Sequence, residues 1–266
     1  MSLRFKTLRS LRLCDESYIT AALVTIAAWA VTVRGADSMS GGMPMPGGWS
    51  MSMMWMMGGP SWFGRAAMFL GMWQTMMVAM MLPSVMPVVL LHRRVMENRA
   101  RPMLAELLLL SGYFGVWLAF GAVAYAAGTT LSSSAMQSQA VSRMIPTATA
   151  LALILAGWYQ VTRWKRLCLS HCRSPIGVLV HHPLRTAADS LRVGIHHGAY
   201  CAACCWGLML IQLVLGIMSL PLMAAVAFVI LLEKTWRHGE SLAAAVGISA
   251  MTAGVLLAIS AIRSFY

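Results

Sequence analysis

The feature that most constrains this chain is a series of apolar runs, each close to the length that a helix needs to cross a lipid bilayer. A transmembrane helix takes roughly 20 mainly apolar residues. Only 11% of the 266 residues are charged, and a typical soluble domain carries about 25%. We therefore predict an all-α fold, a polytopic transmembrane helical bundle of about seven spans, and exclude a soluble enzyme, a disordered chain and a disulfide-stapled module. The predicted spans lie at about 17–33, 64–91, 104–127, 145–162, 198–217, 219–232 and 241–262.

The distribution of basic residues predicts the orientation of these spans. With the N-terminus in the cytoplasm, most of the 20 Lys and Arg residues fall in cytoplasmic segments, and the exceptions are Arg34, Arg65, Arg143 and Arg263. Cytoplasmic loops of membrane proteins carry such an excess of basic residues. The chain is therefore predicted to be N-in and C-out, as a multi-pass membrane protein. The same distribution explains the net charge of +12 without a nucleic-acid partner.

The chain is predicted to form a single transmembrane domain, residues 1–266, with two long polar connections. The first, at about 35–61, is rich in Met, Gly and Pro and is expected to be an extracytoplasmic loop with a short interfacial helix at Met51–Met57. The second, at about 163–197, is expected to be a basic cytoplasmic loop that contains Cys and His.

Methionine is concentrated early in the chain. More than half of the 24 methionines lie between residues 39 and 86. Met68, Met72, Met76 and Met80 are spaced four residues apart, so they share one helix face. Thioethers favour soft ions such as Cu(I), but methionine is also a pliable packing residue. Both interpretations fit the helix, whereas in the Gly-rich loop, where methionine has no core to fill, soft-metal contact is favoured.

Three cysteines lie within five residues in the fifth predicted span. Cys201, Cys204 and Cys205 share one helix face, and Met209 extends it by one turn. A lone cysteine in a membrane helix is usually a small hydrophobic residue, but three so close together favour metal or redox chemistry. A reducing cytoplasm argues against disulfides.

A second group of cysteines lies in the cytoplasmic loop, where Cys168 and Cys172 are four residues apart and His171 stands between them. Nearby basic residues favour the thiolate, although incidental loop cysteines are an equal alternative. Because thiolates and thioethers together select Cu(I), copper is the predicted ion, with zinc and iron as alternatives. The candidate metal ligands are Cys201, Cys204, Cys205, Met209, Cys168, Cys172, His171, His196, His197, Met68, Met72, Met76 and Met80. No role is assigned to Cys14.

Three motifs carry a resemblance to a known family. In chain order they are MMVAMMLPS at 76–84, CLSHCRSP at 168–175 and CAACCWGLM at 201–209. Over about residues 15–262 the chain resembles the bacterial predicted metal-binding integral membrane proteins, a family of unknown function. Ala203 stands where that family commonly has Gly. The resemblance implies an inner-membrane helical protein that binds metal, and it implies no settled activity.

Three functions are compatible with these features. The leading hypothesis is a non-enzymatic membrane protein that captures, transfers or delivers Cu(I), with the lipid bilayer around it and a periplasmic copper carrier or a membrane-complex partner beside it. The second is a membrane metalloenzyme in the style of copper-dependent oxygenases, with Asp189, His196 and His197 as ligands. The third is a non-catalytic subunit of a larger membrane complex. No nucleotide-binding P-loop is present.

Overall fold

The computed structural model describes residues 2–39, 42–55, 59–97, 99, 101–180, 184 and 186–263. Cys14 and the methionines at 39, 53, 56 and 57 have side chains outside this description. The long helices are α1 (Ser2–Met39), α2 (Trp62–Met96), α3 (Pro102–Gln137), α4 (Gln139–Val161), α7 (Ala187–Gly216) and α9 (Gly239–Arg263). The shorter elements are β1 (Gly42–Met45), β2 (Trp49–Ser52), η1 (Met53–Trp55), α5 (Arg163–Cys172), α6 (Pro175–Val180) and α8 (Leu220–Thr235).

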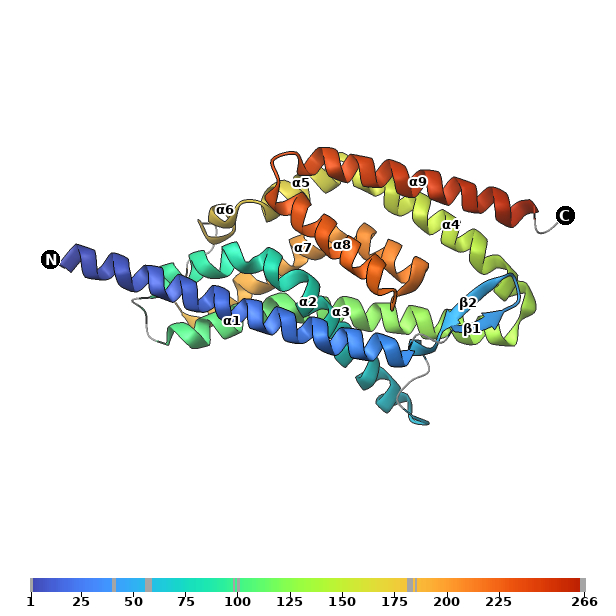
Figure 1. Ribbon diagram of the computed structural model, residues 1–266, viewed down its shortest axis with the longest axis horizontal. Coiled ribbons are helices and arrows are strands. Elements are labelled where there is room, and N and C mark those ends of the chain that lie inside the picture. The colour runs from blue at the N-terminus through green and yellow to red at the C-terminus, as the bar shows by residue number, and fades with distance from the viewer. Residues whose placement is uncertain are drawn as a thin grey trace.

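The predicted all-α bundle is confirmed. Six helices of the described residues are long and apolar enough to cross a membrane, which supports a membrane protein. The seventh predicted span, 219–232, is α8, and its 16 residues extend about 24 Å. That is shorter than the roughly 30 Å hydrocarbon core of a bilayer. The number of full-length spans therefore falls to six, while α8 still reverses the chain between α7 and α9 (Figure 1).

The two ends of the bundle differ in what covers them (Figure 1). The β1–β2 hairpin lies at one end, near the C-terminus of the chain, and we call this the hairpin end. Helices α5 and α6 lie toward the opposite end, where α1 begins, and we call this the α5 end. The N-in, C-out prediction would place the hairpin end outside the cytoplasm.

Single introduced cysteines test this orientation. We expect M45C, on the hairpin, to react with an impermeant thiol reagent added to intact cells, because that end faces outward in the predicted topology. V180C, at the exposed end of α6, should react only after the cells are opened. The unmodified protein controls for native thiols. The reverse labelling pattern would contradict the orientation.

Close helix packing depends on glycines at two interfaces. A Cβ on Gly112 of α3 would lie 2.5 Å from the Leu191 carbonyl of α7. A Cβ on Gly157 of α4 would lie 2.5 Å from the Gly247 carbonyl of α9. Small residues allow membrane helices to approach this closely. The first interface fixes α7, the helix that carries the three cysteines.

Two prolines inside long helices leave carbonyl groups that tryptophans satisfy. Pro83 has no N–H to offer the carbonyl of Ala79, and the indole of Trp29 in α1 donates to that oxygen at 3.2 Å. Pro146 likewise frees the carbonyl of Ser142 in α4, and Trp49 of β2 donates to it at 3.0 Å. Tertiary donors thus let prolines remain within membrane helices, and the second contact anchors the hairpin on α4.

The Met/Gly/Pro-rich segment differs from the loop that was predicted. An antiparallel hairpin pairs Met43 with Met51 and leads into a short 3-10 turn. The predicted helix at Met51–Met57 is therefore wrong for residues 51–52, which belong to β2, and is reduced to a single 3-10 turn at 53–55, while Met56 and Met57 lie outside the described residues. Met51 and Met54 are only 1% and 2% exposed, so the expectation that these methionines have no core to fill is also wrong. The hairpin folds back onto the bundle and buries them, while Met43 stays 41% exposed.

Candidate metal centre

The three cysteines of α7 form a buried group that we call the thiol cluster: Cys201, Cys204 and Cys205. All three are buried, and the Sγ atoms of Cys204 and Cys205 are 3.3 Å apart. Cys201 interacts with both. Met209, also buried, lies on the same helix one turn beyond Cys205. The cluster sits midway along α7, so the structure brings together the soft donors that the sequence pointed to on this helix.

A lysine from α8 reaches the thiol cluster. The ammonium of Lys234 donates to the Cys201 sulfur at 2.9 Å and to the Ser84 hydroxyl of α2 at 3.2 Å. The Tyr113 hydroxyl of α3 lies 3.0 Å from the same sulfur. An adjacent cation stabilises the thiolate form of cysteine, which is the form that binds metal. The surroundings of Cys201 therefore favour a metal-binding thiolate.

A second buried lysine holds the backbone of the cluster in place. Lys165 of α5 forms an ion pair with Glu233 at 2.7 Å and donates to the Cys204 carbonyl at 2.6 Å. Gln160 donates to the other carboxylate oxygen of Glu233 at 3.3 Å. Burial acts to lower the pKa of Lys165, but the Glu233 carboxylate and the nearby thiols outweigh it, so this pKa is raised. Lys165 therefore keeps its charge and ties α5 and α8 to α7.

The two cysteines of α5 occupy different environments. Cys172 is buried and interacts with Cys204 of the thiol cluster. Cys168 is partly exposed and lines a pocket of about 520 Å³ with His171 and Tyr200. Cys172 thus lies beside the buried cluster, and Cys168 lies in the wall of an open pocket near the α5 end of the bundle.

The adjacent histidines of α7 point to different neighbours. The ring of His197 stacks on Tyr113, with centroids 5.6 Å apart, and so lies beside the tyrosine that contacts Cys201. His196 instead packs against Tyr200 at 4.9 Å, and His171 stacks on that same ring at 4.0 Å. His197 therefore lies beside the thiol cluster, whereas His196 lies with His171 and Tyr200. The predicted histidine ligands do not form one site.

Asp189, the third ligand of the metalloenzyme hypothesis, has a structural role. Its carboxylate accepts hydrogen bonds from the Thr186 backbone N–H at 2.8 Å and from the Thr186 hydroxyl at 2.9 Å. Thr186 in turn caps the first turn of α7. This reciprocal capping box starts the helix at Ala187, well before the start at 198 that the apolar run predicted. Helix capping accounts for Asp189 without a metal.

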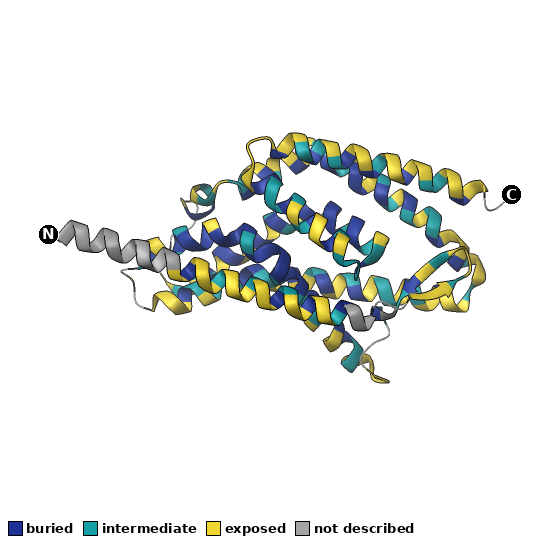
Figure 2. Cartoon of the chain, viewed as in Figure 1, coloured by how far each residue is buried: buried dark blue, intermediate teal, exposed yellow. Residues whose placement is uncertain are grey.

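The methionine stripe of α2 runs from the surface into the core. Met68 is 51% exposed, Met72 is partly buried, and Met76 and Met80 are buried. Ser84, which contacts Lys234, lies one turn beyond Met80. Figure 2 shows α2 changing from exposed near the hairpin end to buried in the centre of the bundle. The methionine stripe therefore ends one turn before Ser84, the residue of α2 that contacts Lys234.

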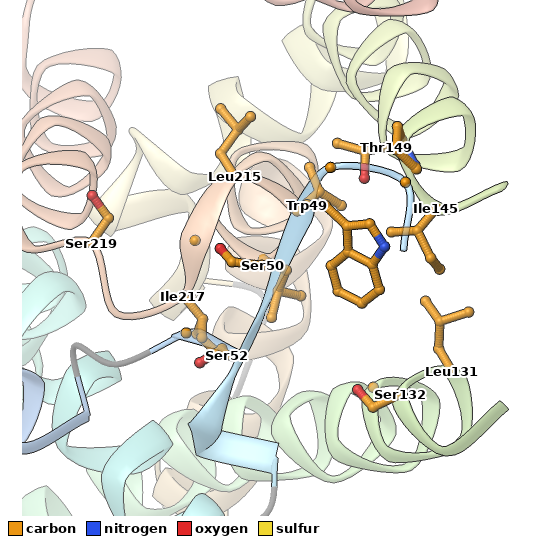
Figure 3. Close-up of a pocket in the computed structure, with 18 of the residues that line it drawn as sticks. Trp49, Ser50, Ser52, Leu131, Ser132, Ile145, Thr149, Leu215, Ile217 and Ser219 are labelled. Atoms are coloured by element: carbon orange, nitrogen blue, oxygen red, sulfur yellow. The ribbon is translucent and has the colours of Figure 1, made fainter. Parts of the chain in front are cut away.

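A pocket of about 810 Å³ lies at the hairpin end. Figure 3 shows Trp49 and Ser50 of the hairpin on one side, Ile145 and Thr149 of α4 beside them, and Leu215 at the end of α7 with Ile217 of the α7–α8 turn on another. Because α8 is short, the turn between α7 and α8 lies inside the bundle and does not reach its end. The hairpin covers the space that remains beyond this turn. The pocket reaches the last residues of α7, 213–216.

The donor set of the thiol cluster suits a soft metal ion. Among the residues that the structure describes, no three His, Cys, Asp or Glu side chains form a group that could hold a metal. The cluster instead offers closely spaced sulfurs, with a thioether next to them on α7. Sulfur ligands bind Cu(I) in preference to hard cations, so the residues fit copper.

Comparison with known proteins decides the family. Residues 70–257 match the sequence profile of the PpoB2 family, which is described as a copper chaperone. The chain belongs to this family of copper chaperones. No curated protein and no solved structure matches the chain. The match spans α2 to α9 and contains the thiol cluster and Lys234, whereas the hairpin and Met68 lie outside it. A copper chaperone family agrees with the prediction that the chain handles copper.

The sequence interpretation missed the groups that surround the thiols. Lys234, Ser84 and Tyr113 contact the cluster or its lysine, and none was a candidate site residue. The available signal was Glu233-Lys234 at the end of an apolar run, since an ionisable residue in a membrane protein's core is a functional candidate by default. No local sequence pattern shows that the end of α8 packs against α7, so the contact of Lys234 with the thiols could not be predicted.

Proposed function

We propose that this protein is a membrane-embedded Cu(I) chaperone that holds copper at the thiol cluster of α7. The observation that carries this proposal is the burial of three thiols beside Lys234. Such a site excludes water and keeps hard, strongly hydrated cations out, while a thiolate and its neighbours bind a soft ion. A chaperone must also release its ion, and further sulfur donors are Cys172, beside the cluster, and Cys168, in the wall of the pocket near the α5 end.

In this proposal copper enters from the hairpin end. Exposed thioethers on the hairpin and at the start of α2 capture the ion, and the stripe that includes Met76 and Met80 leads it inward. Thioethers are neutral, so each contact is weaker than a thiolate contact. The ion would therefore move toward the thiolates. The predicted N-in orientation makes this direction inward from the extracytoplasmic side.

X-ray absorption at the copper edge tests the proposal. The full-length protein is purified in detergent, loaded with Cu(I) without oxygen and washed with a weak chelator. We expect one tightly bound copper with sulfur scatterers only. A first shell dominated by nitrogen or oxygen would contradict the proposal and would favour a histidine site such as His171 with His196.

The surface methionines should matter only when copper is scarce. Their role in the proposal is to raise the local copper concentration near α2, an effect of proximity that loses importance at high supply. We expect M43L/M68L to lower the copper content of the protein in cells grown with little copper and to leave it unchanged in copper-rich medium. The matched control is M51L/M54L, which removes two buried thioethers. An equal loss from the control variant would show that packing, and not capture, is affected.

A further inference from the structure

The buried region around the thiol cluster contains an excess positive charge. Lys165, Glu233 and Lys234 are all buried. The Glu233 carboxylate is engaged by Lys165 at 2.7 Å and by Gln160 at 3.3 Å. These contacts make Lys165 and Glu233 a neutral pair. The ammonium of Lys234 is left to be balanced by another group.

The group that faces this ammonium is a sulfur. Lys234 donates to Ser84, which is neutral, and to Cys201. A buried charge is costly unless it is paired, so a thiolate at Cys201 is the partner that the arrangement requires. The single positive charge of Lys234 can balance a metal–thiolate complex that carries one negative charge.

The charge of a metal–thiolate complex depends on the ion. Two thiolates that bind a monovalent ion, Cu(I) or Ag(I), give a complex with one negative charge. Two thiolates that bind Hg(II) in the same linear geometry give a neutral complex. Next to Lys234 the monovalent complex is balanced, whereas the Hg(II) complex leaves the ammonium without a counter-charge.

We propose that Lys234 is the counter-charge of a two-thiolate complex formed by Cys201 and a neighbouring thiol of the cluster, and that it makes the site selective for monovalent soft ions. Lys234 is a specificity-determining residue in this account, because it touches a ligand and balances the charge of the loaded site. The inference rests on the proposed function, since it takes the thiol cluster as the copper site.

Paired titrations with Ag(I) and Hg(II) test the inference on the full-length protein in detergent, each against a competing chelator. We expect K234M to weaken Ag(I) binding on the order of 100-fold, because the loaded site becomes an unbalanced buried anion. Hg(II) binding should stay unchanged or become tighter. K234R, which keeps the positive charge, should retain the Ag(I) affinity of the unmodified protein.

Each other outcome overturns a distinct statement. Equal losses of Ag(I) and Hg(II) in K234M would show that Lys234 only supports the fold, and unchanged Ag(I) binding would show that its charge is irrelevant. A loss in K234R as large as that in K234M would also overturn the role of charge. If C201S/C204S/C205S binds both ions as tightly as the unmodified protein, the proposed function itself fails, whatever Lys234 does.

Discussion

Replacing Cys201, Cys204 and Cys205 with serine should abolish the tight copper site and leave the bundle folded. Serine is nearly the size of cysteine and keeps a hydrogen-bonding atom beside Lys234 and Tyr113, so packing around α7 changes little. The loss of the Cys201 thiolate leaves the Lys234 ammonium without its counter-charge, so the folded variant should be less stable than the unmodified protein. A serine hydroxyl is a hard ligand that does not replace a thiolate for Cu(I). We expect bound copper to fall from about one ion per protein to near background, measured by elemental analysis after chelator washing, since the loss of the thiolates removes the metal-binding form of the site.

The cysteines of α5 supply the matched control for this experiment. C168S removes a thiol of similar size that lies in the open pocket near the α5 end. It should retain full copper occupancy, because the proposal gives Cys168 a part in release and not in holding. Full occupancy in the triple variant, with an unchanged elution volume and melting temperature, would show that the thiol cluster only packs the core.

Glu233→Gln should produce a large loss of stability although it barely changes the size of the side chain. Glu233 and Lys165 are buried and 2.7 Å apart. The amide is close in shape to the carboxylate, but it leaves the Lys165 ammonium buried without a counter-charge. Breaking a buried ion pair in this way costs about 3–5 kcal/mol. We expect a decrease of that size in the free energy of unfolding in mixed detergent micelles.

Two further variants separate charge from local disturbance. E106Q breaks the partly exposed Arg93–Glu106 pair, at 3.6 Å, and should cost less than about 1 kcal/mol because solvent screens it. K165M/E233Q removes the unpaired cation and should be more stable than E233Q alone. A change below about 1 kcal/mol in E233Q would contradict the view that this pair is buried and charged.

The long apolar runs predicted most of the helices, because a bilayer requires each span to be apolar over its whole length. Residues 219–232 are apolar but too few for a full span, and the structure forms α8 there, which is shorter than a bilayer-spanning helix. The hairpin was not predicted because its strands have four residues each. Tertiary contacts stabilise it, among them the hydrogen bonds from Trp49 to the Ser142 carbonyl and from the Ser142 hydroxyl to the Pro46 carbonyl.

The candidate site was predictable where ligands follow one another along a helix. Cys201, Cys204 and Cys205 share a face by their spacing alone. The approach of Lys234 depends on α8 reversing against α7, which no local pattern specifies. The separation of His196 from His197 follows from the angle of about 100° between successive residues on a helix, and the sequence did not show which neighbours each ring would meet.

The position of the bound ion tests the central claim most directly. Crystals of the full-length protein loaded with Cu(I) without oxygen are measured on both sides of the copper absorption edge. Our account predicts an anomalous difference peak among the sulfurs of Cys201, Cys204 and Cys205, next to the Lys234 ammonium. A single peak beside His171, His196 and Tyr200, or one confined to the methionines of the hairpin and α2, would contradict it.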